Sequence, residues 1–381
     1  MNGSTKQKRI FIVTGEHSGD IHAAKVAQQL GSEYEIEGIG GENLKNAGVK
    51  LFSGHEKMGQ VGISLKMIID HITLGRRVVD YITKVYKPDL VLLVDYGAFN
   101  LGISRFLKKA GIKTFYYIPP QVWASRKHRI KTIKKYIDKV LCIFPFEKPL
   151  YESYGINTHY CGHPLIAQLP PKADRTAFFK KHGLDPAKKL VSIFPGSRVF
   201  ELKNLMEIFV KSAKELHKEH PELQFCISHA PNLPDKVFEK FIPPTPLARE
   251  VSFKVIKGEN QALLSISDAL ILASGTVSLE AALYQVPMII AYRGPFLFYL
   301  IYLVLRSIKR ASLPNIIADK DIVPELLQYD ATAGNIVYEI EKLLYDTLYR
   351  EENIRQLSQV RAMLSDKNSA YEAADAINKD L

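Results

Sequence analysis

A short turn, Ser274-Gly275-Thr276, follows an apolar run at 269–273 and precedes a helical pattern. A helix that begins there presents backbone N–H groups without intrahelical acceptors, together with the positive end of its dipole, and such an end binds phosphate. Glu280 lies one turn further on, where its carboxylate can accept hydrogen bonds from a ribose diol. No lysine follows the glycine, as a P-loop would require. The pattern therefore predicts a nucleotide-sugar site rather than a nucleoside triphosphatase.

A second candidate for phosphate binding is the segment FPGSRVFEL at 194–202, which also follows an apolar run. Gly196 and Ser197 permit close approach of the backbone to a ligand. Arg198 offers a planar fork of donors that pairs with phosphate in a way that lysine cannot copy, and Glu201 is spaced to position it. The alternative interpretation is a surface salt bridge at the start of a helix.

The segment GEHSGD at 15–20 ends the first apolar run of the chain. Open α/β sheets bind ligands at glycine-rich turns that follow their strands, and Glu16, His17 and Asp20 would then face the ligand. The spacing is not GxGxxG, so it gives little support for a dinucleotide. The alternative is an ordinary turn between a strand and a helix, with Ser18 as the helix N-cap.

Asp95 is a single carboxylate at the end of the aliphatic run 90–94, and Tyr96-Gly97 follow it. A carboxylate at the end of a buried strand is well placed to act as a general base. An Asx-type turn is the alternative. Position alone does not distinguish the two.

Rigid elements must position these four turns. Continuous apolar runs alternate with amphipathic helical patterns such as 23–30 and 102–110, which is typical of parallel βαβ units. The chain is therefore predicted to be α/β, with two doubly wound, Rossmann-like domains that face a cleft. The expected strands are 9–14, 35–39, 90–95, 114–118 and 139–143 in the first domain, and 190–194, 224–228, 269–273 and 288–291 in the second.

The proline-rich stretch at 165–172, LIAQLPPK, marks the expected break between the domains. We expect an N-terminal domain at 1–168 and a C-terminal domain at 169–340. Residues 341–381 continue a helical pattern without a strand, so this tail is expected to pack back on one of the domains.

Composition limits the class of protein. The chain has 381 residues, of which 46% are hydrophobic, enough for two domains with substantial cores. Its three cysteines have neither a disulfide nor a zinc-site spacing. The first apolar run is too short for a secretory signal, and the apolar run at 296–305 is shorter than the roughly 20 residues of a membrane-spanning helix. We therefore expect a cytoplasmic protein that does not cross a membrane.

Two stretches are candidates for contact with a membrane surface. Leu65, Ile68 and Ile69 fall on one face of a helical pattern, and Phe296 and Leu303 belong to an apolar segment that basic residues follow. An apolar face beside cations suits a lipid headgroup layer, although a core helix is the alternative for both stretches. The net charge of +11 would suit anionic lipid, nucleic acid or phosphorylated substrates. No zinc-finger, RRM or KH signature favours nucleic acid.

Taken together, these segments resemble the lipid-A-disaccharide synthase family, and the similarity covers almost the whole chain. The matching motifs, in order, are GEHSGD (15–20), MGQVGIS (58–64), VDYGAFN (94–100), YYIPPQVWASR (116–126), FPFE (144–147), GHP (162–164), PGSR (195–198), ASGTVSLEAAL (273–283), PMIIAYR (287–293) and LPNIIA with VPELLQ (313–328). The resemblance implies a GT-B fold, with an acceptor-binding N-terminal domain and a C-terminal domain that binds the UDP-sugar.

The resemblance also implies an inverting hexosyltransferase of lipid A and lipopolysaccharide biosynthesis. Its donor would be UDP-2,3-diacylglucosamine and its acceptor 2,3-diacylglucosamine 1-phosphate, called lipid X. The product would be a β-1,6-linked disaccharide 1-phosphate, with UDP released. Such an enzyme would lie on the cytoplasmic leaflet of the inner membrane as a peripheral protein. It would need no metal or other cofactor and no nucleic acid, and it could form a homodimer.

Roles for single residues follow from the same resemblance. Asp95 would be the general base for the acceptor 6-hydroxyl, with Asp20 as a rival, and Arg198 would hold the UDP diphosphate. The other implied contacts are Gly196, Ser197, Ser274, Gly275, Thr276, Glu280 and Asn315 for the donor, and Glu16, Ser18, Gly19 and Asp20 for the acceptor.

Two other functions fit parts of the pattern. A UDP-N-acetylglucosamine 2-epimerase shares the two-domain fold and a similar SGT–Glu element, but it needs no membrane-contacting segment such as 296–305. A non-enzymatic protein that binds lipid or nucleic acid would use the basic residues and lose affinity steeply as salt rises. It would have no role for Asp95.

Overall fold

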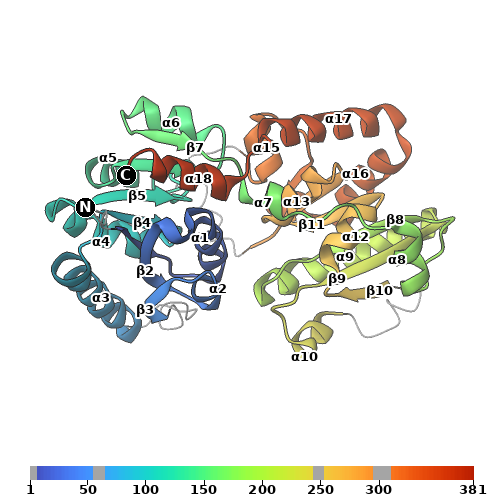
Figure 1. Cartoon of the computed structure of the whole chain (residues 1–381). Coiled ribbons are helices and arrows are strands. Elements are labelled where there is room, and N and C mark those ends of the chain that lie inside the picture. Colours follow the sequence, from blue (N-terminus) through green and yellow to red (C-terminus); the bar gives the residue numbers. More distant parts are fainter. Residues whose placement is uncertain (1–6, 55–64, 243–252, 295–309) are drawn as a thin grey trace. The chain divides into compact units, whose positions relative to one another are not determined.

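A computed structural model describes residues 7–54, 65–242, 253–294 and 310–381, with side chains at 65–68 left out. The chain forms two compact units, drawn in Figure 1. Unit 1 comprises Met1–Ala167 and Leu364–Leu381, and unit 2 comprises Gln168–Met363. The first division falls beside the proline-rich stretch. The C-terminal tail is shared between the units, because the chain returns to unit 1 at Leu364.

Unit 1 is built on a parallel sheet of seven strands in the order β3-β2-β1-β4-β5-β6-β7. The order reverses between β1 and β4, which are hydrogen-bonded neighbours. The strands are β1 (Lys8–Val13), β2 (Tyr34–Gly40), β3 (Lys50–Gly54), β4 (Leu90–Val94), β5 (Lys113–Tyr117), β6 (Lys139–Cys142) and β7 (Thr158–Tyr160). The central strands β1 and β4 are almost wholly buried, which explains their continuous apolar character.

Helices connect these strands and cover the sheet. They are α1 (His17–Leu30), α2 (Glu42–Asn46), α3 (Leu65–Asp80), α4 (Gly97–Lys109), α5 (Arg129–Tyr136), α6 (Glu147–Ser153), α7 (Pro164–Gln168) and the C-terminal α18 (Ser369–Asn378), with a π-helical segment at Tyr81–Tyr86. Leu74 and Val78 of α3 and Leu107 of α4 pack into one core with side chains of β1 and β4.

The C-terminal helix α18 belongs to unit 1 and packs against α1; Figure 1 shows the red helix beside the blue one. Two tyrosines of the sheet fix this segment. The Tyr117 hydroxyl hydrogen bonds to Ser369 Oγ at 2.7 Å, and the Tyr160 hydroxyl donates to the Leu364 carbonyl at 2.7 Å. These buried partners lie more than two hundred residues apart in the chain, so no local sequence pattern indicates them.

Unit 2 repeats the plan with six parallel strands in the order β10-β9-β8-β11-β12-β13. Here the order reverses between β8 and β11. The strands are β8 (Lys189–Phe194), β9 (Leu223–His229), β10 (Phe253–Lys257), β11 (Ala269–Ala273), β12 (Met288–Tyr292) and β13 (Glu325–Leu327). The helices are α8 (Arg175–His182), α9 (Val199–Glu219), α10 (Asp235–Phe238), α12 (Asn260–Ile266), α13 (Val277–Leu283), α15 (Leu313–Ala318), α16 (Ala333–Tyr345) and α17 (Thr347–Met363).

The nine strands expected from the sequence are confirmed, and so is the helical tail. β3, β7, β10 and β13 were not predicted from the sequence. These strands have three to five residues and lie at or next to sheet edges, so much of their surface stays exposed and their apolar signal is weak. Helices α1 and α4 also begin earlier than expected: α1 starts at His17, within the segment 15–20, and α4 starts at Gly97, two residues after Asp95.

Candidate active site

The candidate turns lie at the reversal points of the two sheets. In unit 1, residues 15–20 follow β1 and Asp95 follows β4, and these strands are neighbours. In unit 2, residues 195–198 follow β8 and residues 274–276 follow β11, again neighbouring strands. Open α/β sheets bind ligands outside the carboxyl ends of their strands at the point where the strand order reverses. Each unit therefore brings two of the predicted turns together at such a point.

Asp95 has a strained backbone that its neighbours hold in place. Asp95 and Tyr96 both have positive φ angles, +52° and +47°, a conformation that is uncommon for residues other than glycine. The carbonyl oxygen of Asp95 accepts hydrogen bonds from the Asn100 amide at 2.8 Å and from the Tyr116 hydroxyl at 2.7 Å. Strain of this kind persists only where surrounding groups fix it, and it gathers at functional sites.

The carboxylate of Asp95 lies beside the first turn of the chain. Ser18 Oγ donates a hydrogen bond to Asp95 Oδ2 at 3.4 Å. Burial raises the pKa of the Asp95 carboxyl above its usual range, and hydrogen bonds from the Tyr96 N–H and the Ser18 hydroxyl partly offset this shift. Burial and the Asp95 charge also raise the pKa of Glu16. A carboxylate with a raised pKa is a stronger base, as a catalytic role requires.

Asp20 holds the backbone of a neighbouring loop, which argues against its predicted contact with the acceptor and against its predicted role as an alternative base. Its side chain is fully buried. Oδ1 accepts from the Gly41 N–H at 2.6 Å and the Leu44 N–H at 3.3 Å, and Oδ2 accepts from the N–H and the amide of Asn43 at 3.0 and 2.9 Å. These bonds satisfy the backbone at the start of α2. A carboxylate with its acceptor positions so occupied is not available to a substrate proton.

Gly19 is buried beneath the same turn. A Cβ at this position would lie 2.4 Å from Thr14 Oγ1 and 3.5 Å from Asp95 Cβ. Only glycine therefore lets α1 start this close to β1 and to the Asp95 loop. Close packing therefore explains why a glycine stands at position 19. Glu16 and Ser18, by contrast, are exposed at the same turn.

A pair of aromatic side chains next to Asp95 was not identified from the sequence. The Tyr96 hydroxyl forms a short hydrogen bond with His71 Nε2 of α3. The Tyr96 ring also closes over Gly15, where a Cβ would lie 2.3 Å from the ring. His71 lies on a different element, twenty-five residues before Tyr96, so no local pattern indicates that the two side chains meet. In the sequence, only the position of Tyr96 directly after Asp95 pointed to this pair.

In unit 2, the PGSR loop presents Arg198 at the start of α9. The expected contact with Glu201 is confirmed: Arg198 NH1 donates to Glu201 Oε1 at 3.2 Å, and Glu201 Oε2 accepts from the N–H groups of Ser197 and Arg198. Gly196 has φ +106°, and a Cβ there would lie 2.2 Å from Glu201 Oε2. The buried Glu201 thus anchors the loop, while the Arg198 side chain stays 78% exposed and free to meet an anion.

The SGT turn follows β11 and leads into α13. Gly275 and Thr276 are exposed, and open space surrounds the position of a Cβ on Gly275. Within the described residues, the N–H groups of Gly275, Thr276 and Val277 donate to no acceptor. Exposed backbone N–H groups at the start of a helix are suited to bind an anion. One turn into α13, burial raises the pKa of Glu280, and a hydrogen bond from Gln261 partly offsets the shift.

A family model described as lipid-A-disaccharide synthetase matches residues 10–380. The chain belongs to this family. Curated relatives named lipid-A-disaccharide synthase agree: a protein of Coxiella burnetii is 36% identical over 378 residues, covering 97% of this chain and 98% of the relative. One of Legionella pneumophila is 37% identical over 381 residues, covering 98% and 97%. This member of the synthase family is therefore a glycosyltransferase of lipid A disaccharide formation.

Solved structures of other families show the same fold. A UDP-GlcNAc 2-epimerase from Neisseria meningitidis, bound to UDP-GlcNAc, has a TM-score of 0.65 at 14% identity and covers 97% of this chain and 100% of its own. A glycosyltransferase of kitacinnamycin has a TM-score of 0.65 at 13% identity, with 99% and 100% covered. The GT-B fold is thus confirmed. Fold similarity alone cannot separate epimerase from transferase, but the family match does.

Asn315 of this synthase-family member is turned inward, which argues against its predicted contact with the donor. The side chain is 1% exposed. Its amide donates to the Val323 carbonyl at 2.9 Å and to Glu325 Oε1 at 2.8 Å, while its Oδ1 accepts from the N–H groups of Ile322 and Val323. All its polar atoms therefore serve to hold the segment between α15 and β13, and Asn315 can act on a ligand only by positioning that segment.

Gln328, by contrast, has a side-chain N–H donor without a partner among the described residues, and this residue was not predicted as part of the site. It follows β13 at the carboxyl edge of the sheet, has φ +54° and is 7% exposed. Its Oε1 accepts from the Gly294 N–H at 3.2 Å, but its buried Nε2 has no partner among the described residues. A buried side-chain amide without a partner is uncommon in folded proteins. In the sequence, only its place at the end of the motif VPELLQ drew attention to Gln328.

The predicted membrane contacts of the synthase lie partly outside the described residues. Phe296 and Leu303 fall there, as do the side chains of Leu65 and Ile68. Ile69 of α3 is 55% exposed, and its neighbour Ile72 is 53% exposed. Both lie on the helix whose other face packs into the core through Leu74 and Val78. Among the helices that the structure describes, none combines the length and apolar content needed to cross a bilayer.

Proposed function

We propose that this protein transfers a 2,3-diacylglucosamine group from its UDP derivative to the 6-hydroxyl of 2,3-diacylglucosamine 1-phosphate. The product is the β-1,6-linked disaccharide 1-phosphate, and UDP is released. The family assignment supports the reaction class. The observation that supports the residue roles is the strained, partly buried Asp95, whose carboxyl has a raised pKa, at the reversal point of the unit 1 sheet.

In this proposal, unit 1 binds the acceptor and Asp95 is the base. The carboxylate takes the proton of the acceptor 6-hydroxyl as that oxygen attacks C1 of the donor sugar. The bond between C1 and the diphosphate oxygen breaks, and its electron pair leaves with UDP. A single displacement of this kind inverts C1 and needs no covalent enzyme intermediate. Glu16 and Ser18, exposed on the turn beside Asp95, contact the acceptor.

Unit 2 binds the donor. Arg198 pairs with the diphosphate and stabilises the negative charge that develops as UDP leaves. The N–H groups of Gly275 and Thr276 donate to the phosphate oxygens, and Glu280 accepts from the ribose hydroxyls. The exposure of Arg198 and the unused donors of the SGT turn support these roles.

We further propose that the protein lies on the cytoplasmic leaflet of the inner membrane, because both substrates carry acyl chains. The exposed Ile69 and Ile72 support this proposal. Arg76 and Arg77, exposed on the same helix, would meet anionic headgroups. The apolar side chains would enter the headgroup layer, as interfacial helices do.

Incubation of the full chain with UDP-2,3-diacylglucosamine and lipid X, followed by mass spectrometry, tests the reaction. We expect the disaccharide 1-phosphate and one equivalent of UDP. A matched pair of variants tests the site: Asp95→Asn removes the base, whereas Asp80→Asn changes an exposed carboxylate that pairs with Lys84. Release of UDP without disaccharide, or interconversion of the donor with its 2-epimer, would contradict the proposal.

A further inference from the structure

An open pocket lies at the amino-terminal edge of the unit 2 sheet, the edge opposite the PGSR and SGT turns. Its volume is about 420 Å³. Its walls come from the chain before α8, the residues before β11 and β12, and the first turns of α17, with Lys172, Arg175, Ser265, Gln285, Arg350 and Ile354 among the lining residues. Because the strands are parallel, this pocket is separated from the candidate donor turns by the length of the sheet.

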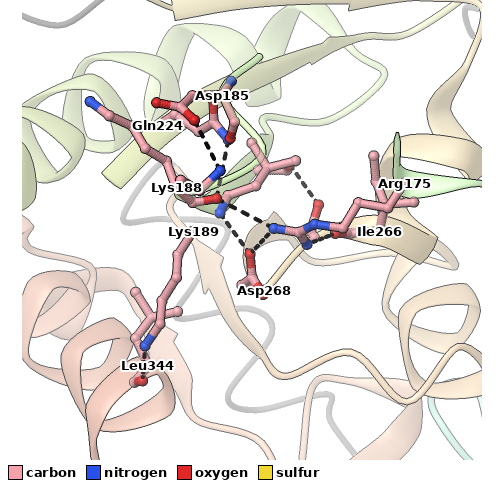
Figure 2. A network of polar contacts seen from close by, with 12 residues as sticks. Arg175, Asp185, Lys188, Lys189, Gln224, Ile266, Asp268 and Leu344 are labelled. Atoms are coloured by element: carbon pink, nitrogen blue, oxygen red, sulfur yellow. Dashed lines mark hydrogen bonds and ion pairs between the residues drawn. The ribbon is translucent and has the colours of Figure 1, made fainter. Parts of the chain in front are cut away.

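Cations outnumber acids around this pocket. Arg175 donates to Asp268 Oδ2 at 2.8 Å and to the Ile266 carbonyl at 2.6 Å, as Figure 2 shows. Asp268 also accepts from the Leu190 N–H at 2.7 Å. This carboxylate neutralises Arg175. Within the described part of the chain, neither Lys172 nor Arg350 forms an ion pair, although the Asp268 charge also acts on Arg350. The three cations Lys172, Arg175 and Arg350 therefore exceed this single carboxylate by two charges.

Arg350 is oriented by neutral acceptors. Its NH1 donates to the carbonyls of Asp268 and Leu343, both at 2.8 Å. These bonds fix the guanidinium but leave its charge in place, and burial lowers its pKa from the usual value. Arg350 also lies in the first turn of α17, the positive end of that helix dipole, where a cation is disfavoured and an anion is favoured. Arg175 is the first residue of α8, so it also lies in the first turn of its helix.

The polar and apolar parts of the pocket indicate what it would hold. The guanidinium of Arg350 and the exposed ammonium of Lys172 suit the oxygens of a phosphate group. Gln285, which has φ +59°, adds an amide to the lining. Ile354, Val286 and Pro287 form an apolar wall. The volume falls within the usual range for small-molecule sites, about 300–1,000 Å³, which is room for more than a bare phosphate.

We propose that this pocket binds a small, soluble phosphate monoester, with the phosphate at Lys172 and Arg350 and the organic part against Ile354 and Pro287. The site would be additional to the donor and acceptor sites. It does not depend on the proposed function, because none of its residues belongs to that machinery.

Isothermal titration with glucose 1-phosphate tests the proposal, using the full chain saturated with UDP so that donor contacts are filled. The matched variants are Lys172→Glu in the pocket and Lys180→Glu, an exposed lysine of α8 that does not line it. Both side chains are exposed, so both variants should fold. We expect binding to the parent and to Lys180→Glu, at least tenfold weaker binding to Lys172→Glu, and none of neutral glucose.

Three outcomes would overturn the proposal. The first is no binding of glucose 1-phosphate to the UDP-saturated protein. The second is equal affinity of Lys172→Glu and Lys180→Glu. The third is equal affinity of the parent for inorganic phosphate, which would show that the apolar wall contributes nothing. Arg350→Gln provides a further check, because it keeps a donor for the Leu343 carbonyl but removes the charge.

Discussion

Ser18 Oγ donates a hydrogen bond to Asp95 Oδ2 at 3.4 Å and so connects the turn after β1 to the turn after β4. The two residues are 77 positions apart, and they meet because their strands are neighbours at the reversal point of the sheet. The contact has a chemical consequence. It favours the charged form of a carboxylate that burial otherwise disfavours, so it tunes the basicity of Asp95.

Asp95→Asn should abolish transfer while the protein keeps its fold and its UDP affinity. Loss of a general base typically lowers rates by about 10²–10⁴-fold. Asparagine tolerates the left-handed backbone of this position, so the urea midpoint should stay equal or rise. Disaccharide formation, UDP titration and urea unfolding measure the three quantities. A variant that keeps most of its kcat would exclude Asp95 as the base.

Ser18→Ala should move the acidic limb of the pH profile of kcat/KM to higher pH. The Ser18 hydroxyl stabilises the ionised carboxylate, so its removal raises the pKa of Asp95 further, and the base is then protonated over a wider range. Because the 3.4 Å bond is long, we expect a shift of less than about one pH unit, equivalent to about 1.4 kcal/mol. Ser153→Ala, an exposed serine of α6, serves as the control. A shift toward lower pH would contradict the assigned direction.

Asp20→Asn should destabilise the fold but spare the chemistry. An amide nitrogen in place of one carboxylate oxygen would face backbone N–H donors, leaving at least one of them unpaired. The cost is about 2–4 kcal/mol of unfolding free energy, measurable by urea titration. The folded fraction should keep the parental kcat. Asp95→Asn should show the reverse pattern, and a hundredfold loss of kcat in folded Asp20→Asn would reinstate Asp20 as the base.

Arg198→Ala should weaken UDP binding about tenfold or more and slow turnover as well, because a charge-assisted pair with the diphosphate is lost. Arg198→Lys should restore little, since lysine lacks the planar fork. The exposed Lys203 of the same helix, changed to alanine, controls for general charge loss. Calorimetric titration with UDP gives the affinities. Unchanged UDP affinity in Arg198→Ala would remove Arg198 from the donor site.

The double variant Ile69→Ser with Ile72→Ser should bind vesicles of anionic phospholipid less tightly. Each side chain is about half exposed, so its insertion is worth about half of the 1.5–3 kcal/mol of a fully buried aliphatic residue. The pair together therefore contributes about 1.5–3 kcal/mol, and we expect a loss of at least about tenfold in a co-sedimentation assay. Leu348→Ser, at an 80% exposed position of α17, is the control. Equal binding of all three proteins would show that α3 makes no membrane contact.

Much of the fold was predictable because buried parallel strands are continuously apolar. β4 and β11 are buried along their whole length, and both were located from sequence within one residue. Short strands at the sheet edges, such as β10 with its mixed exposure, were not. The return of the chain to unit 1 at Leu364 was also not predictable from the sequence, because it depends on hydrogen bonds to distant residues such as Tyr160.

The sequence by itself determined the positions of the long buried strands, the turns that follow them and the family, because each of these depends on local runs of residues. Only the tertiary structure decided what each side chain in those turns does. Asp20 and Asp95 look alike in sequence, yet one is fully occupied by the backbone around Asn43 and the other lies beside Ser18 on a strained loop. Burial and hydrogen-bond partners set the chemistry of a carboxylate, and both come from residues that only folding brings together.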